Sequence, residues 1–208
     1  MLILGYDPGR PRANAAALLH IAEASAHEAW LHTDDSVGQV LEWAQDRMAE
    51  RGLSILDAAG IDTYLSWSTE RRGWRPMDTF LRDQYPAVRR SVFPSNSARG
   101  AMAVQGMAMA LRLRRLWPEI LLNETHPKVL YHALSGQNYV FGDHMRRWLL
   151  NRFEPPVGVT IHNEHEWDAL FSAWITWQGM KRVFETDLMT QGDDRLLLPA
   201  GNVSYYWI

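Results

Sequence analysis

Three short apolar stretches of this chain each end in an acidic residue. They cover residues 2–7, 53–62 and 119–124, and Pro-Gly follows directly after the first. A short apolar run that stops at a turn signal is typical of a buried strand. The pattern therefore predicts three buried strands with Asp7, Asp62 and Glu124 at their carboxyl ends. The alternative for Asp7 is that it only starts a turn, because Asp before Pro-Gly does this well.

Two further pairs of apolar segments indicate hairpins. Residues 15–23 and 28–33 are rich in apolar side chains and flank a polar segment at 24–27. They predict a β-hairpin, with a helix as the alternative because alanine is frequent there. Near the C-terminus, residues 196–198 and 204–208 flank a Pro-Ala-Gly-Asn turn, which predicts a small terminal hairpin.

Helical spacing of apolar residues marks much of the remaining chain. It predicts an amphipathic helix at 37–51, which Ser36 caps and Gly52 ends. Asn163, with Glu166 three residues later, caps a long closing helix that runs to residue 182. Further helices are predicted at residues 77–85, 98–117, 128–134 and 143–153.

The helix at 98–117 is rich in methionine and alanine. We expect Met102, Met107 and Met109 to pack in the core, where methionine fills irregular gaps. The segments that precede this helix, 66–76 and 87–97, are polar or irregular and are predicted as loops.

The order of the predicted elements is strand, hairpin, helix, strand, helices, strand, helices and a closing helix. This is the order of the ribonuclease H-like fold, an α/β fold. Its five-stranded mixed sheet begins with three antiparallel strands and adds two parallel ones. We therefore predict a single ribonuclease H-like domain over residues 1–208, with helices that flank the sheet and the terminal hairpin as a short extension.

The composition is that of an ordinary globular protein, with 47% hydrophobic and 22% charged residues. No apolar run approaches the roughly 18 residues of a membrane helix, and no basic region precedes an apolar segment at the N-terminus. We therefore expect no membrane anchor and no signal peptide. The chain has no cysteine, which excludes disulfides, thiol catalysis and cysteine-based zinc sites and fits a cytoplasmic setting.

Charge is distributed unevenly, although the net charge is only -3. Residues 71–152 hold 13 arginines and one lysine against five acids, whereas the rest of the chain is acidic. A basic segment on an acidic frame favours a polyanionic partner such as nucleic acid, and arginine suits bidentate contacts with phosphate. The alternative is that these arginines form solvated helix faces. The candidate phosphate-binding residues are Arg71, Arg72, Arg75 and Arg82.

Four carboxylates are the candidate catalytic and metal-binding residues. In the predicted sheet the ends of the first and fourth strands are neighbours, so Asp7 and Asp62 face one another. Glu124 ends the next strand, and Asp168 lies one turn into the closing helix, whose start reaches the same edge. Converging carboxylates are the hard oxygen ligands that Mg²⁺ and Mn²⁺ prefer. Two such ions can bind both the attacking and the leaving oxygen of a phosphodiester.

Each of these acids also has a structural interpretation. Asp62 can be a turn residue, and Glu124 can pair with Lys128. Asp168 can stabilise the positive end of the helix dipole. The arrival of several acids at one sheet edge, in the order of the fold, favours the metal site.

Histidines offer a different kind of chemistry. His162-Asn-Glu-His165 lacks the His-Glu-x-x-His spacing of a zinc protease. His126 and His165 are candidates for moving a proton, because histidine titrates near neutral pH. The sequence has neither a GxxxxGK[ST] phosphate-binding loop nor a GxSxG nucleophile elbow.

Several short motifs carry a resemblance to a known family. They are Gly5-Tyr-Asp7, Gly60-Ile-Asp62, Arg75-Pro-Met-Asp78, Phe80-Leu-Arg82, Ser91-Val-Phe-Pro94, Asn123-Glu124-Thr-His-Pro127 and His165-Glu-Trp-Asp168-Ala-Leu. With these motifs the chain resembles the family known as domain of unknown function 429, described as predicted nucleases of the ribonuclease H-like fold.

The resemblance implies a set of site residues. Asp7, Asp62, Glu124 and Asp168 match the acidic site of the family. Arg75, Asp78 and Arg82 match a polar cluster near it. The chain departs from the family pattern at Tyr6, where a small aliphatic residue is expected, and in the residues between Arg75 and Asp78.

Two functions are consistent with these features. The first is a nuclease, a hydrolase that cleaves phosphodiester bonds of nucleic acid with Mg²⁺ or Mn²⁺. The second is a non-catalytic module of the same fold that binds nucleic acid or a protein partner. Trp67 and Trp74, if exposed, would then stack on bases or anchor the partner. A gain in thermal stability on adding metal distinguishes the two, because a ligand stabilises the state that binds it.

Overall fold

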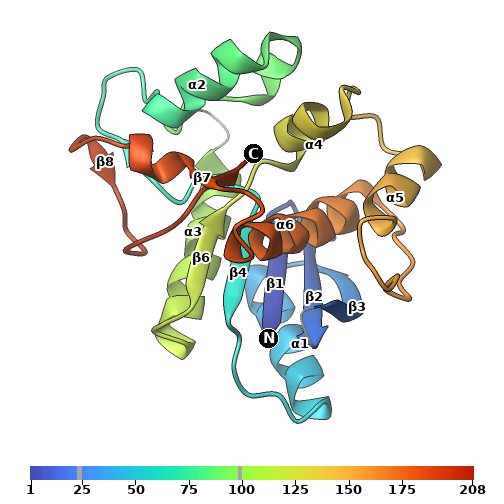
Figure 1. Cartoon of the computed structure of the whole chain (residues 1–208). Coiled ribbons are helices and arrows are strands. Elements are labelled where there is room, and N and C mark those ends of the chain that lie inside the picture. The colour runs from blue at the N-terminus through green and yellow to red at the C-terminus, as the bar shows by residue number, and fades with distance from the viewer. Residues whose placement is uncertain (23–24, 98–99) are drawn as a thin grey trace.

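A five-stranded mixed sheet forms the centre of the protein (Figure 1). The computed structural model describes residues 1–22, 25–97 and 100–208. The sheet has the strand order β3-β2-β1-β4-β6, in which β1, β2 and β3 are antiparallel and β4 and β6 join in parallel. Its strands are β1 Leu2–Asp7, β2 Asn14–Ala22, β3 Ser25–Asp34, β4 Ala58–Ile61 and β6 Leu121–Glu124. The α/β class and the mixed five-stranded sheet agree with the prediction.

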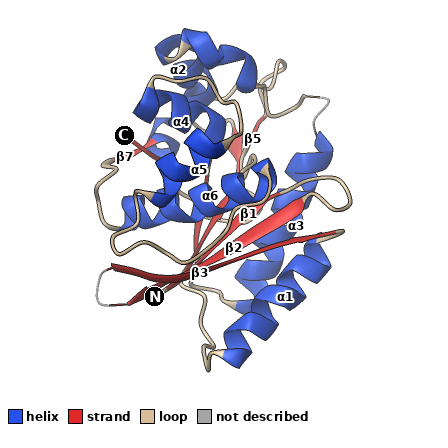
Figure 2. Cartoon of the chain, turned by 90° about the vertical axis from the view of Figure 1, so that its right-hand side faces the viewer, coloured by secondary structure: helices blue, strands red, loops and turns tan. Residues whose placement is uncertain are grey.

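Helices cover both faces of this sheet (Figure 2). Helices α1 and α3 pack on the face that receives Leu4 and Tyr6, whereas α6 lies across the opposite face, which receives Ile3. The six predicted helices are all present: α1 Val37–Glu50, α2 Pro76–Gln84, α3 Gly100–Leu116, α4 Pro127–Ser135, α5 Asp143–Leu150 and α6 Glu164–Met180. Two short 3-10 helices are η1 Pro86–Ser91 and η2 Leu188–Gln191.

Helix α6 is buried along almost its whole length, from Glu166 to Gly179. Two glycines of the sheet make room for it. A Cβ atom on Gly5 would lie 1.8 Å from the carbonyl oxygen of Ala169, and one on Gly60 would lie 2.3 Å from that of Ser172. Any larger residue would therefore push α6 away from β1 and β4. This close packing brings the first turns of α6 to the strands that end in acids.

The two ends of α1 follow the predicted capping chemistry. The Oγ of Ser36 accepts a hydrogen bond from the backbone N–H of Gln39 at 3.3 Å. Gly52 has a φ of +67°, a conformation that favours glycine. The predicted strand at 53–62 is shorter than expected, because only Ala58–Ile61 forms β4 and Ile55 is 64% exposed.

The predicted terminal hairpin is wrong. Strand β8 Leu196–Leu197 pairs with β5 Trp67–Ser68, and β9 Tyr206–Trp207 pairs with β7 Thr186–Asp187. The tail instead docks along the open edge of β6, where the N–H of Ser204 donates to the carbonyl of Leu122 at 2.8 Å. Backbone groups of β5, β6 and β7 hydrogen-bond to the two tail segments, so these segments do not pair with each other.

Helix α3 is observed where the sequence predicts it, as far as the described residues reach. The predicted start at residue 98 lies outside the described residues, and the helix is observed from Gly100. Met107 and Met109 are buried as expected, but Met102 is 39% exposed. Met102 lies in the first turn of α3 and stays partly exposed, so the core expectation is wrong for this residue. Among the described residues, no helix is long and apolar enough to cross a membrane.

Candidate metal centre

Three of the predicted acids converge at the carboxyl ends of β1 and β4. Asp7, Asp62 and Asp168 each offer one carboxylate oxygen, and these oxygens lie within 4.8 Å of one another. Asp7 is the last residue of β1, Asp62 follows β4 directly, and Asp168 lies near the start of α6. Asp7 and Asp168 are each 3% exposed, and Asp62 is partly buried. The strand-end pattern thus places Asp7 and Asp62 correctly, and the position one turn into the closing helix places Asp168.

Only part of this cluster is satisfied by the protein itself. The Nδ1 of His165 lies 2.7 Å from Oδ2 of Asp7. The hydroxyl of Tyr139 donates to Oδ2 of Asp168 at 2.9 Å. The other oxygen of Asp168, Oδ1, is buried and has no hydrogen-bond partner among the described residues. Buried polar atoms in native proteins nearly always have a partner, so this oxygen fits one ligand position of a cation.

Burial raises the pKa of all three carboxyl groups. Desolvation is the largest cause for each of them. The pKa of Asp62 rises to about 7. The pKa values of Asp7 and Asp168 rise well above the ordinary value, because the neighbouring carboxylates also repel their charge. Without a cation, the cluster therefore holds protons at neutral pH.

Lys128 is the cation that acts most strongly on the cluster. It lies near the start of α4, and its Nζ is 4.9 Å from the ring centroid of Tyr139. Partial burial lowers its pKa, but Asp168, Asp62 and Asp7 together raise it above the ordinary value. Within the described part of the chain, Lys128 forms no ion pair within 4.0 Å. Its ammonium group can therefore contact an anionic ligand.

Sequence reasoning considered Lys128 only as a surface partner of Glu124. The position of Lys128 in the sequence does indicate the site, because Lys128 follows the strand-ending Glu124 by four residues. At that point α4 leaves the sheet edge at which the other acids meet.

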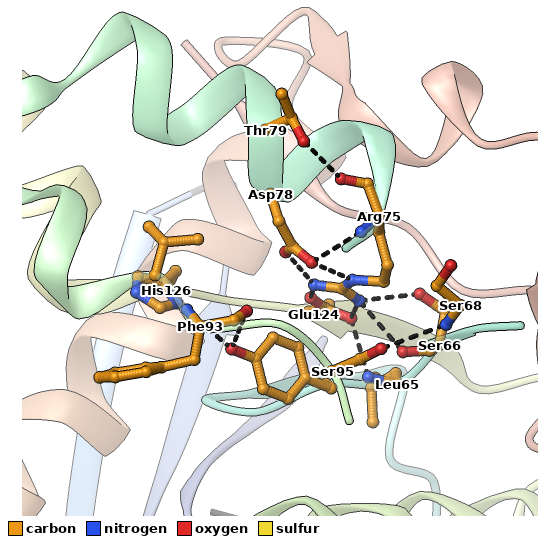
Figure 3. A network of polar contacts seen from close by, with 12 residues as sticks. Leu65, Ser66, Ser68, Arg75, Asp78, Thr79, Phe93, Ser95, Glu124 and His126 are labelled. Carbon is orange, nitrogen blue, oxygen red and sulfur yellow. Dashed lines mark hydrogen bonds and ion pairs between the residues drawn. The ribbon is translucent and has the colours of Figure 1, made fainter. Parts of the chain in front are cut away.

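Glu124 lies in a second polar cluster, which adjoins the three acids (Figure 3). Its two carboxylate oxygens accept hydrogen bonds from the guanidinium of Arg75 at 2.8 and 2.6 Å, and Oε2 also accepts from the N–H of Leu65 at 2.8 Å. Arg75 is 1% exposed and donates further to Asp78 and to Ser66. Glu124 therefore stands outside the three-acid group, and its carboxylate neutralises a buried arginine.

This cluster also corrects the expectation for Arg75. A guanidinium that is buried between two carboxylates has no access to a phosphate backbone. Arg82 also has a structural role, because it donates to the carbonyls of Arg89 and Val92 at 2.8 and 3.0 Å and stacks on Trp74. Arg75 and Arg82 therefore hold the segment around α2 together.

The remaining predicted phosphate contacts are Arg71 and Arg72, which are exposed on the loop before α2. Neither is among the cations that act most strongly on the three acids. Their contact with phosphate remains a prediction. Trp67 and Trp74 are half-buried, and Arg82 covers one face of Trp74. Neither tryptophan therefore presents a fully exposed ring to a base.

No protein-family model matches the chain, and neither a curated protein nor a solved structure matches it.

Proposed function

We propose that this protein is a divalent-metal-dependent nuclease of the ribonuclease H-like fold, which hydrolyses phosphodiester bonds with Mg²⁺ or Mn²⁺. The observation that carries the proposal is the convergence of Asp7, Asp62 and Asp168 within 4.8 Å, together with the buried, unpartnered Oδ1 of Asp168. An all-carboxylate donor set is the set that hard divalent cations prefer.

The topology supports the same proposal. The strand order, with three antiparallel strands followed by two parallel ones, is the one on which the ribonuclease H-like prediction rests. The resemblance to domain of unknown function 429 implies an acidic site at matching positions. Three of its four acids lie together in this structure, and the fourth, Glu124, supports the adjoining segment through Arg75.

The neighbouring residues have clear roles in such a site. Asp7, Asp62 and Asp168 would hold the cations. Bound divalent cations supply an activated water at neutral pH and stabilise the charge that develops on the phosphoryl oxygens. Lys128 would bind a phosphate oxygen through its ammonium group. Tyr139 orients Asp168 through its hydrogen bond.

His165 would move a proton in such a site. Its ring contacts Asp7 through Nδ1, and its side chain is 36% exposed. The nitrogen that does not face Asp7 can therefore exchange a proton with solvent or with the leaving group.

A cleavage assay tests the proposal. Single-stranded, duplex and DNA–RNA hybrid substrates are incubated with the protein and Mn²⁺, Mg²⁺ or EDTA. We expect cleavage only with a divalent cation, and a loss of orders of magnitude in Asp62→Asn. Asp46→Asn is the matched control, because Asp46 is an exposed acid on α1. Metal binding without cleavage of any substrate would favour the non-catalytic module instead.

A further inference from the structure

A pocket adjoins the three acids on the side of Asp62 and Lys128. Its cavity volume is about 90 Å³. The pocket shares Asp62 and Lys128 with the metal centre, and the rest of its wall combines apolar and aromatic side chains with polar ones, Glu124 among them. These other lining residues include Tyr64, Phe93, Met102, Ala103 and His126.

Tyr64 is held in place on this wall, and its hydroxyl also fixes the backbone of Phe93. The hydroxyl of Tyr64 donates to the carbonyl of Phe93 at 2.7 Å and accepts from its N–H at 3.2 Å. The guanidinium of Arg75 lies 4.6 Å from the ring centroid of Tyr64 and covers one face of the ring. The buried cluster of Arg75 and Glu124 thus supports the pocket from behind, and Figure 3 shows Phe93 next to this cluster.

His126 gives the pocket a polar edge without charge. Its Nε2 lies 3.1 Å from the carbonyl oxygen of Ser91, so this nitrogen carries the hydrogen. Burial lowers the pKa of His126 to about 4, and the ring is neutral at physiological pH. A neutral ring that donates through Nε2 leaves Nδ1 as an acceptor.

We infer that this pocket binds one unpaired nucleobase, whose adjoining phosphate then lies at the three acids and Lys128. The inference rests on the proposed nuclease function and names its substrate class. A flat, apolar ring matches the aromatic wall, and stacking on aromatic side chains is the usual way in which proteins bind single-stranded nucleic acid. At about 90 Å³ the pocket is smaller than the closed apolar cavity of about 150 Å³ that holds benzene, so it receives part of one base and leaves the rest of the base in solvent.

A paired base does not fit this arrangement. In a duplex both faces of a base are stacked on its neighbours, and its polar edge is occupied by the complementary strand. An apolar wall also offers little to a second phosphate. The pocket therefore favours single strands or nucleotides over intact duplex.

The test compares two ligands that contain no phosphodiester bond and differ only by the base. Thymidine 5′-monophosphate and 2-deoxyribose 5-phosphate are titrated into the protein with saturating Mn²⁺, and binding is followed by calorimetry. We expect the nucleotide to bind at least about tenfold more tightly. Phe93→Ala should bring the ratio of the two affinities close to one, and Met102→Ala should reduce it several-fold. Because Met102 is exposed, the Met102→Ala protein should fold, and its ratio of affinities can be measured even if Phe93→Ala does not fold.

Leu111→Ala is the matched control, since Leu111 is exposed on the same helix and does not line the pocket. This variant should keep the ratio of the parent. Equal affinity for the two ligands in a parent that binds Mn²⁺ overturns the base pocket and leaves the nuclease proposal standing. A parent that binds neither Mn²⁺ nor either phosphate compound overturns both proposals.

Discussion

Replacing Asp7 by asparagine separates a metal ligand from a structural residue. The substitution keeps the size and shape of the side chain and removes one negative charge from the acidic cluster. Because burial raises the pKa of Asp7, the folded metal-free protein either binds a proton there or holds the charge of Asp7 beside Asp62, and asparagine avoids both costs. Where both acids are charged, two unit charges at the outer limit of 4.8 Å repel by about 3.5 kcal/mol at an effective dielectric constant of 20 and by about 0.9 kcal/mol in water. The pair of Asp7 with His165, whose side chain is 36% exposed, contributes at most about 1 kcal/mol in the opposite direction.

The variant without metal should therefore be more stable than the parent at pH 8, by roughly 1–3 kcal/mol. In a chain of 208 residues this raises the melting temperature by roughly 2–12 °C. Adding Mn²⁺ at a hundredfold excess over its dissociation constant should stabilise the parent by about 2.7 kcal/mol. The variant should gain far less, because one ligand charge is missing.

Thermal unfolding in EDTA and in Mn²⁺ measures both quantities in the same assay. Asp46→Asn provides the control for removing an exposed negative charge. If Asp7 only supports a turn, its loss should lower the stability of the metal-free protein by about 1 kcal/mol. An Asp7→Asn protein that is less stable in EDTA, yet stabilised by Mn²⁺ as much as the parent, would refute the metal site.

Three further predictions concern pH, the second cluster and the packing of α6. Because burial raises the pKa of Asp62 to about 7, the folded protein binds a proton between about pH 4 and pH 7 that the unfolded chain has lost. The free energy of unfolding in EDTA should therefore fall as pH rises through this range. Asp62→Asn should be more stable than the parent at pH 8 but not at pH 4, which chemical unfolding at the two pH values measures. Glu124→Gln leaves the Arg75 guanidinium with an incomplete set of partners and should lower the free energy of unfolding by about 3–5 kcal/mol. Calorimetry should still show Mn²⁺ binding to this variant. A variant of full stability that no longer binds Mn²⁺ would show that Glu124 is a metal ligand. Gly5→Ala places a Cβ 1.8 Å from the carbonyl oxygen of Ala169, so it should lower stability by about 1–3 kcal/mol or more and weaken Mn²⁺ binding. Unchanged Mn²⁺ affinity would show that the metal site does not depend on the close packing of α6 on β1.

The features that the sequence revealed are those that depend on local pattern. Apolar runs ending at Asp7 and Asp62 locate two strand ends, and Asn163 with its capping pattern locates the start of α6. Once the order of strands is recognised, the neighbourhood of β1 and β4 follows, and Asp168 is brought to the same edge. These steps need only periodicity, turn signals and a known order of elements.

The features that the sequence did not reveal depend on distant pairs. Glu124 ends a strand just as Asp7 does, but its partner Arg75 is 49 residues away, and no local pattern distinguishes a paired acid from a free one. Lys128 was missed for the same reason, because the three acids that act on its ammonium group lie on other segments of the chain. Met102 lies in the same methionine-rich helix as Met107, and the sequence does not show that Met102 lines a pocket instead of packing in the core.

The most direct test of the central claim is the position of bound Mn²⁺. A crystal of the parent protein grown or soaked with Mn²⁺ is measured for the anomalous signal of the metal. The account predicts an anomalous peak at ligand distance from the carboxylates of Asp7, Asp62 and Asp168, and its loss in Asp168→Asn. A peak bound elsewhere on the chain, with the three acids free of metal at saturating Mn²⁺, would contradict it.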